Sequence, residues 1–140
     1  KYIKKLIYVL LLAVATQVAT AQIKILYGPY LQNEENEATI VWVADKPSIG
    51  WVELAPNDGT HYYGEERPKY FDTTNGVKNT SLLHAVKVKA LTPGTTYRYR
   101  IYSQEVLSHE GINVIYGRVA ASDVYKKNAL TFTTCDPNKK

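Results

Sequence analysis

The stretch from Leu91 to Ile101 constrains the fold more than any other part of this chain. Its sequence is Leu-Thr-Pro-Gly-Thr-Thr-Tyr-Arg-Tyr-Arg-Ile. Pro93 fixes its own φ and lacks an amide hydrogen, so a strand must end there. Gly94 follows at the corner where a type II turn requires a positive φ. From Tyr97 onward every second residue is aromatic or β-branched, and this period of two predicts a strand with one buried face.

The spacing Leu-x-Pro-x-x-x-Tyr is also the sequence form of a tyrosine corner. In that arrangement the hydroxyl of a buried tyrosine bonds to backbone a few residues upstream and fixes one corner of a β-sandwich. We therefore expect Tyr97 to be buried and bonded to upstream backbone, with Tyr99 on the same buried face. Tyr102 falls on the opposite face, and we expect its hydroxyl to matter much less for stability. The stretch predicts a β-sandwich and gives no sign of an enzyme.

Residues 1–21 have the pattern of an export signal. Lys1, Lys4 and Lys5 precede an apolar run over 6–14, and Ala19-Thr20-Ala21 supplies the small residues of a cleavage site. The apolar run is shorter than the roughly 20 residues that a membrane span needs. We expect cleavage before Gln22 and a periplasmic or extracellular protein that is not attached to the membrane.

The charge balance gives no support for a nucleic-acid partner. Three of the 17 basic residues lie in the leader, so 14 face 13 acidic residues in the remainder. Nucleic-acid binding requires a clustered basic face rather than a balanced surface. The single cysteine, Cys135, lies in the terminal tail and has no partner within the chain.

From Ile23 onward the chain reads as β-structure, and no helical period follows the leader. The face shared by Ala38, Ile40 and Trp42 places Trp42 in the core. A turn is expected at 46–48 and a polar connection over 107–113. Residues 60–80 are the least regular part, with strand-like pieces at 61–63 and 70–71. The strands are expected at 25–31, 38–44, 50–54, 82–91, 97–102, 114–120 and 129–134. Seven strands at this spacing predict one all-β domain over 22–134, an immunoglobulin-like antiparallel sandwich.

The residues that could carry catalysis are scattered. His61, His84 and His109 do not have the close spacing of metal ligands, and neither a Gly-x-Ser-x-Gly elbow nor a phosphate loop is present. The alternating strand around His84 favours a hydrogen-bonded structural histidine, whereas the other two are expected on the surface. No catalytic or metal-binding residue and no cofactor is therefore assigned to this chain.

The aromatic content allows a second function. Twelve tyrosines and two tryptophans in an exported sandwich could form a platform on which sugar rings stack. With Trp42, Tyr97 and Tyr99 assigned to the core, the candidates for such a platform are Tyr62, Tyr63, Tyr70 and Trp51.

Several motifs, taken together, resemble a known family. Val41-Trp42, Leu91-x-Pro-Gly-Thr-x-Tyr97 and Leu130-Thr-Phe-Thr-Thr134 look like a fibronectin type III domain. The order Gly28-Pro-Tyr-Leu-Gln32, Ala38-Thr-Ile-Val-Trp-Val43, Gly50-Trp-Val-Glu53 and His84-x-Val-x-Val88 is more specific. It resembles the N-terminal domain of purple acid phosphatases, in particular those of secreted bacterial metallophosphoesterases, over residues 25–134.

This resemblance implies that the chemistry belongs to a domain that follows. In the family, a dinuclear Fe, Zn or Mn centre in that domain hydrolyses phosphoesters, with ligands from Asp-x-His, Gly-Asp-x-x, Gly-Asn-His and Gly-His-x-His motifs. None of these motifs occurs in this sequence. The resemblance therefore implies a non-catalytic accessory domain whose partner is its own C-terminal metallophosphoesterase domain, with 135–140 as the start of the linker. The alternative is a free-standing adhesion or carbohydrate-binding sandwich. Contact with a catalytic domain is expected from the loops over 60–76 and 107–128, with Tyr62, Tyr63, Tyr70 and Tyr125 as possible anchors.

Overall fold

The computed structural model describes residues 21–124 and 129–138, and all regular structure in them is β. The strands are β1 (Ile25–Asn33), β2 (Ala38–Pro56), β3 (Lys69–Phe71), β4 (Thr73–Thr74), β5 (Val77–Lys78), β6 (Ser81–Val88), β7 (Thr96–Glu110), β8 (Asn113–Ala121) and β9 (Leu130–Thr133). Among these residues there is no helix, and so none that could cross a membrane. Residues 1–20 of the expected leader lie outside the described part of the chain, as does Tyr125.

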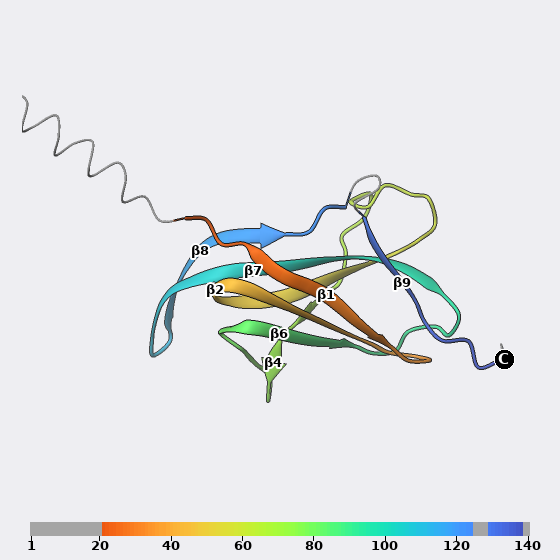
Figure 1. The fold of residues 1–140 in the computed structure, drawn as a ribbon, viewed down its shortest axis with the longest axis horizontal. Helices are drawn as coiled ribbons and strands as arrows, with labels where there is room; N and C mark the ends of the chain where they lie inside the picture. The colour runs from red at the N-terminus through yellow and green to blue at the C-terminus, as the bar shows by residue number, and fades with distance from the viewer. Residues whose placement is uncertain (1–20, 125–128, 139–140) are drawn as a thin grey trace, which may run out of the picture.

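Seven of the strands form one antiparallel sheet that curls into the two layers of a β-sandwich, as Figure 1 shows. The first layer consists of β1, the first half of β2 and β6. The second consists of β3, the second half of β2 and β7, with β8 and β9 both paired to β7. Strands β4 and β5 form a separate hairpin. The fold class predicted from the sequence is therefore confirmed.

Strand β2 joins the two layers without a loop, and here the expected turn at Lys46-Pro47-Ser48 is wrong. The pairing of β2 with β6 is interrupted between Val43 and Ser48, where the strand bends from one layer into the other. Proline is tolerated there because Pro47 falls in this gap, where no ladder hydrogen bond requires its missing amide hydrogen. The two strands expected at 38–44 and 50–54 are thus one strand of 19 residues.

The core between the layers follows the predicted alternation. Trp42 and Ile101 are fully buried and Tyr99 is 2% exposed. The nitrogen Nε1 of Trp42 donates a hydrogen bond to Ser103 Oγ at 2.8 Å, so the polar atom of the ring is satisfied inside the core. The same cluster contains Ala38, Ile40, Val52, Leu54, Val86, Val88, Leu91 and Phe132.

The corner at Pro93-Gly94 has the predicted form. Gly94 has a φ of +64°. Tyr97 is partly buried against the core, and its hydroxyl accepts a hydrogen bond from the backbone N–H of Thr92 at 3.0 Å. The expected bond to upstream backbone is present, although Tyr97 is less buried than expected.

Two segments expected as connections differ from the structure. Residues 107–113 are not a loop, because β7 continues to Glu110 and pairs with β8 around a tight turn at Gly111, whose φ is +60°. A polar composition concealed this hairpin from sequence reasoning. In contrast, His61-Tyr62-Tyr63 is not strand-like but part of the loop between β2 and β3.

Candidate functional site

A row of aromatic rings crosses the outer face of the second layer. Trp51 on β2 pairs with Phe71 on β3 and with Tyr102 on β7. The Trp51 and Tyr102 rings are stacked, with centroids 4.9 Å apart, and the Trp51 and Phe71 rings are tilted at 5.4 Å. All three rings are half-buried. Cross-strand aromatic pairs of this kind stabilise a sheet and also form the sort of surface on which ligands stack.

A buried carboxylate lies in the next row of the same face. Glu53 is 5% exposed, and its Oε1 accepts hydrogen bonds from the hydroxyls of Tyr63 at 2.7 Å and Tyr102 at 2.5 Å. The Tyr63 hydroxyl in turn accepts a bond from Nη1 of Arg100 at 2.6 Å. Burial and the bond to Glu53 raise the pKa of the Tyr102 hydroxyl. Because two hydroxyls converge on one buried carboxylate oxygen and Arg100 donates to one of them, this network holds its members in one arrangement.

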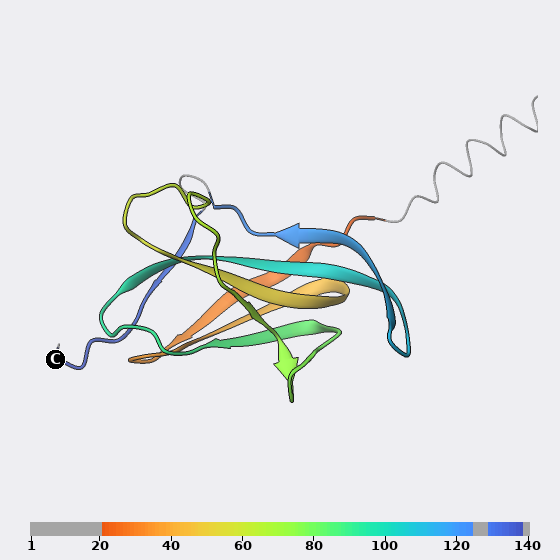
Figure 2. The ribbon, with the colours of Figure 1, turned by 180° about the vertical axis from the view of Figure 1, so that it is seen from behind.

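Two arginines of β7 fasten loops over this face. Nε and Nη1 of Arg98 donate to the carbonyls of Pro56 at 2.8 Å and Thr60 at 2.7 Å. Nε of Arg100 donates to the carbonyl of Ser122 at 2.6 Å. Loop 57–68 is thereby drawn across the outer side of the second layer, where its Tyr62 packs with Ala55 and Val124 in a second small core. Figure 2 shows this loop on the side of the second layer that faces away from β6.

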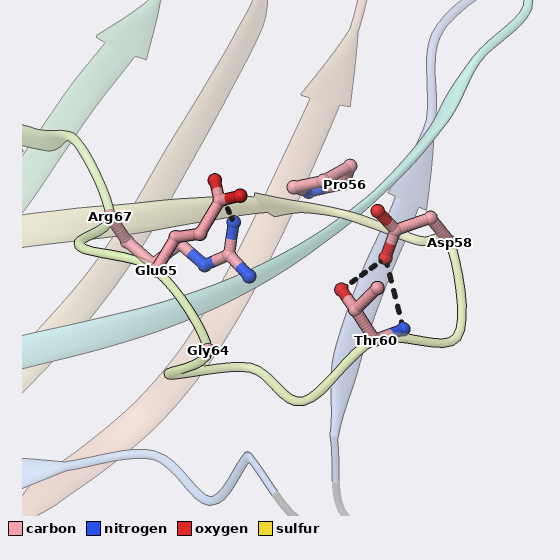
Figure 3. A pocket seen from close by; sticks show the side chains of 6 residues that line it. All are labelled: Pro56, Asp58, Thr60, Gly64, Glu65 and Arg67. Atoms are coloured by element: carbon pink, nitrogen blue, oxygen red, sulfur yellow. Dashed lines mark hydrogen bonds and ion pairs between the residues drawn. The ribbon is translucent and has the colours of Figure 1, made fainter.

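A pocket of about 270 Å³ opens in the same loop region. Its lining residues are shown in Figure 3 and are Pro56, Asp58, Thr60, Gly64, Glu65 and Arg67. The hydroxyl and amide of Thr60 donate to Asp58 at 2.5 and 3.1 Å, and these bonds lower the pKa of the Asp58 carboxyl. The buried Arg67 guanidinium donates to the carbonyls of Tyr62 and His61 and lies 3.9 Å from Glu65. The Thr60 hydroxyl and the Asp58 carboxylate are thus engaged with each other, and the Arg67 guanidinium is held by backbone carbonyls of the same loop.

Asp72, His84 and Ser48 form a chain with the order of a hydrolase triad. His84 Nδ1 lies 2.8 Å from Asp72 Oδ2, and His84 Nε2 lies 3.0 Å from Ser48 Oγ. A nucleophilic serine must be reached by a substrate, but Ser48 and His84 are both fully buried. A Cβ added at Gly50 would lie 2.6 Å from the His84 ring, so there is no room beside it. The chain is therefore a brace between β2, β6 and the segment after β3, and the expected structural role of His84 is confirmed.

The other two histidines lie apart from this brace. Both are exposed, and His109 Nε2 lies 3.0 Å from the Gly111 carbonyl oxygen. Over residues 21–124 and 129–138, no group of three or more His, Cys, Asp or Glu side chains could hold a metal ion.

The tyrosines expected as contact or sugar-stacking residues do not form an open platform. Tyr62 is 3% exposed, because it fills the small core under loop 57–68, so its ring is not offered to a partner. Tyr63 is 41% exposed, but its hydroxyl is bonded inward. Tyr70 is half-buried against the main core. Tyr102 lies on the face opposite to the core, as expected, but its ring stacks on Trp51 and its hydroxyl bonds to Glu53, contacts that the sequence did not predict.

Sequence reasoning missed the Glu53 network, although a signal for it exists. Glu53 lies on the same strand face as Trp51. On the later strand, the alternate residues Arg98, Arg100 and Tyr102 also share one face. A carboxylate and two arginines on facing strands predict cross-strand pairing once the register is known.

The comparisons with known proteins add little to this geometry. No protein-family model and no curated protein matches the sequence. Among solved structures, the chain is similar to a computationally redesigned β-sandwich protein, with a TM-score of 0.47 and 17% sequence identity. The match covers 85% of this chain and 100% of the redesigned protein.

Proposed function

We propose that this chain is a non-catalytic accessory domain of a secreted metallophosphoesterase of the purple acid phosphatase type. In this proposal the sandwich packs beside a C-terminal domain of its own polypeptide, and that domain carries the dinuclear metal centre and hydrolyses phosphoesters. The sandwich supplies stability and shapes the approach to the active site, since pockets are often found at domain interfaces. The order of sequence motifs over residues 25–134 supports the family assignment.

The observation that carries the accessory role is the anchoring of the chain as it leaves the sandwich. After β9, the amide of Thr134 donates to the Thr95 carbonyl and the amide of Cys135 donates to the Glu34 carbonyl, both at 3.0 Å. The amide of Gly94 donates to the Cys135 carbonyl at 3.2 Å. The departing chain is therefore fixed between the Pro93-Gly94 corner and the turn from β1 to β2. A fixed exit gives whatever follows a defined starting direction.

The chemistry of the sandwich is consistent with a supporting role. Metal-assisted hydrolysis needs several ligands converging on an open position. The polar groups described above are instead paired with one another or buried. For the alternative of a free-standing adhesion or sugar-binding sandwich, the tyrosines singled out in the sequence, Tyr62, Tyr63 and Tyr70, form no open platform, and glycan binding is one outcome of the test.

The test compares two forms of the gene product. One is the chain over 22–140 and the other is the product continued to its natural stop codon. We expect metal-dependent phosphomonoesterase activity with Fe, Zn or Mn only in the longer form, and a loss of its stability or turnover when residues 22–134 are deleted.

Three results would contradict the proposal. Activity of 22–140 that requires metal and is lost in His109→Ala would make the sandwich itself an enzyme. A longer form that keeps its stability and turnover without 22–134 would remove the supporting role. Binding of 22–140 to a panel of glycans, lost in Trp51→Ala, would favour the sugar-binding alternative.

A further inference from the structure

Part of the outer face of the first layer is apolar and exposed to solvent. In the register of the sheet, Tyr27, Val43 and Leu83 lie side by side on β1, β2 and β6. The next row consists of Tyr30, Val41 and Ala85. Tyr27 and Tyr30 are each 61% exposed and Leu83 is 57% exposed. We call these six residues the apolar face.

Such a face is unusual for the outside of an antiparallel sandwich. One side of each sheet normally packs on the core while the other carries polar side chains to water. Here none of the six positions is charged, and tyrosine and aliphatic side chains are typical of the central part of a protein interface. A contiguous exposed patch of this kind marks an interaction surface.

The position of the chain exit indicates what covers it. The next row along the first layer is polar and consists of Gln32, Thr39 and Lys87. Directly after Gln32, Asn33 donates from Nδ2 to the Thr133 carbonyl at 3.1 Å. Together with the bond from Cys135 to Glu34, this places the departing chain at the end of β1, beside the apolar face. Figure 1 shows the C-terminal end next to the turn between β1 and β2.

A second group of exposed apolar residues lies far from the exit. It belongs to the β7–β8 hairpin and includes Leu107, Ile112 and Ile115. In both views the tip of this hairpin lies at the opposite end of the molecule from the C-terminal end (Figure 2). The path from residue 138 to the apolar face is therefore much shorter than the path from residue 138 to the tip of this hairpin.

We infer that the apolar face is the docking surface for the domain that follows this sandwich in the same polypeptide. This inference rests on the proposed function for the existence of that domain. It replaces the contact expected from loops 60–76 and 107–128, because loop 57–68 is occupied with covering the second layer. The surface that the following domain presents is largely apolar, since a charge placed against Val41, Val43 or Leu83 would lose its hydration without gaining a partner.

The experiment measures solvent access to individual side chains. Hydroxyl-radical footprinting is carried out on the chain over 22–140 and on the product continued to its natural stop codon. We expect oxidation of Tyr27 and Tyr30 to fall at least fivefold in the longer form. Tyr116, 42% exposed on β8, serves as the internal control and should be oxidised equally in both.

Variants separate docking from folding. Leu83→Lys should restore oxidation of Tyr27 and Tyr30 in the longer form, because it places a charge in the contact. The matched control is Ile112→Lys, at a position 98% exposed on the distant hairpin, and it should leave the protection unchanged. In 22–140 alone both variants should keep the urea midpoint of the parent chain, which shows that they fold.

The outcomes distinguish this inference from the proposed function. Equal oxidation of Tyr27 and Tyr30 in the two forms, in a longer form that hydrolyses phosphoesters, would overturn the inference alone. Protection in a longer form without such activity would support the inference and overturn the proposed function. A reading frame that stops at Lys140 would overturn both. Protection that appears in 22–140 alone as its concentration rises would overturn the inference in favour of a second copy of the chain.

Discussion

The two outer faces of this sandwich differ in the residues they carry and in how far the chain itself covers them. The face of the second layer carries charged and aromatic residues, and loop 57–68 covers much of it. Hydrogen bonds from Arg98 and Arg100 hold this loop in place. The face of the first layer carries tyrosine, valine and leucine and has no such cover. The polar face is thus closed by its own chain, and the apolar face is left open. Polar groups on a sheet surface do not by themselves identify the side that meets a partner.

Alkaline pH should produce the largest loss of folding stability, because the tyrosines with raised pKa values lie in the core and on the face that loop 57–68 covers. Burial raises the pKa of Tyr99 to about 12 and also raises the pKa of Tyr62 and Tyr102. A tyrosine with a raised pKa holds its proton more firmly in the folded state. Its contribution is complete below the ordinary value of 10.0 and is lost as the pH rises toward about 12. For Tyr99 alone the loss is about 2–3 kcal/mol.

Urea unfolding of 22–140 at several pH values measures this loss. The matched control is Tyr99→Phe, which should lose less stability than the parent chain over the same interval. Parallel curves for the two proteins would contradict the assignment to Tyr99.

Replacing Glu53 by leucine should cost about 3 kcal/mol, because the hydroxyls of Tyr63 and Tyr102 then lose their buried carboxylate and keep only each other as hydrogen-bond partners beside Arg100. Denaturant unfolding of 22–140 measures the change. Glu110→Leu, at an exposed position near the tip of the β7–β8 hairpin, is the control and should change stability by no more than about 0.5 kcal/mol. A similar small effect of both substitutions would show that the covered face is not held by this network.

The two tyrosine hydroxyls of β7 should rank in the order opposite to that expected from sequence. Tyr102→Phe removes a bond to a buried carboxylate and should cost about 1–2 kcal/mol. Tyr97→Phe removes only the acceptor of the Thr92 amide at an exposed corner and should cost about 1 kcal/mol or less. Thermal or urea unfolding of the two variants settles the order. A larger loss for Tyr97→Phe would restore the tyrosine corner as the stronger constraint.

The smallest effect is expected on the open face. Leu83→Ser in 22–140 should change the unfolding free energy by no more than about 0.5 kcal/mol, because the side chain already faces water. Val86→Ala, on the inner face of the same strand, should cost about 2 kcal/mol through the cavity it leaves. If Leu83→Ser proved as costly as Val86→Ala, the apolar face would be part of the folded core rather than an interface.

Local patterns in the sequence predicted the core but not the surfaces. Alternation placed Trp42 and Tyr99 inside, and Pro93-Gly94 placed the corner, because these features depend on a few consecutive residues. The sequence also shows Val41 and Val43 on the second face of their strand. Their meaning depends on Tyr27 and Leu83 lying opposite, which only the register of three strands reveals.

The covered face required information of another kind. The positions of Tyr62 and Tyr63 depend on the path of loop 57–68, and no alternating or helical pattern in the sequence predicts that path. That path depends on the hydrogen bonds from Arg98 to the carbonyls of Pro56 and Thr60. Arg98 lies about forty residues away from these two residues along the chain. Contacts at such separations leave no local signature, so the two tyrosines read as surface aromatics.

The uninterrupted length of β2 also shapes how the chain reaches its folded state. This one strand pairs with β1 and β6 at its beginning and with β3 and β7 at its end. The pairing with β1 is a local hairpin closed at Asn33 and Ala38, whereas the pairings with β6 and β7 join residues far apart in the sequence. Closing such distant pairings carries a large loss of chain entropy before any of them becomes stable, which is why sandwiches of this kind fold in milliseconds to seconds rather than microseconds. Until these pairings form, Val41 and Val43 lie unshielded on a segment able to pair with other strands. The interval before β2 closes is the period in which this protein is most exposed to aggregation.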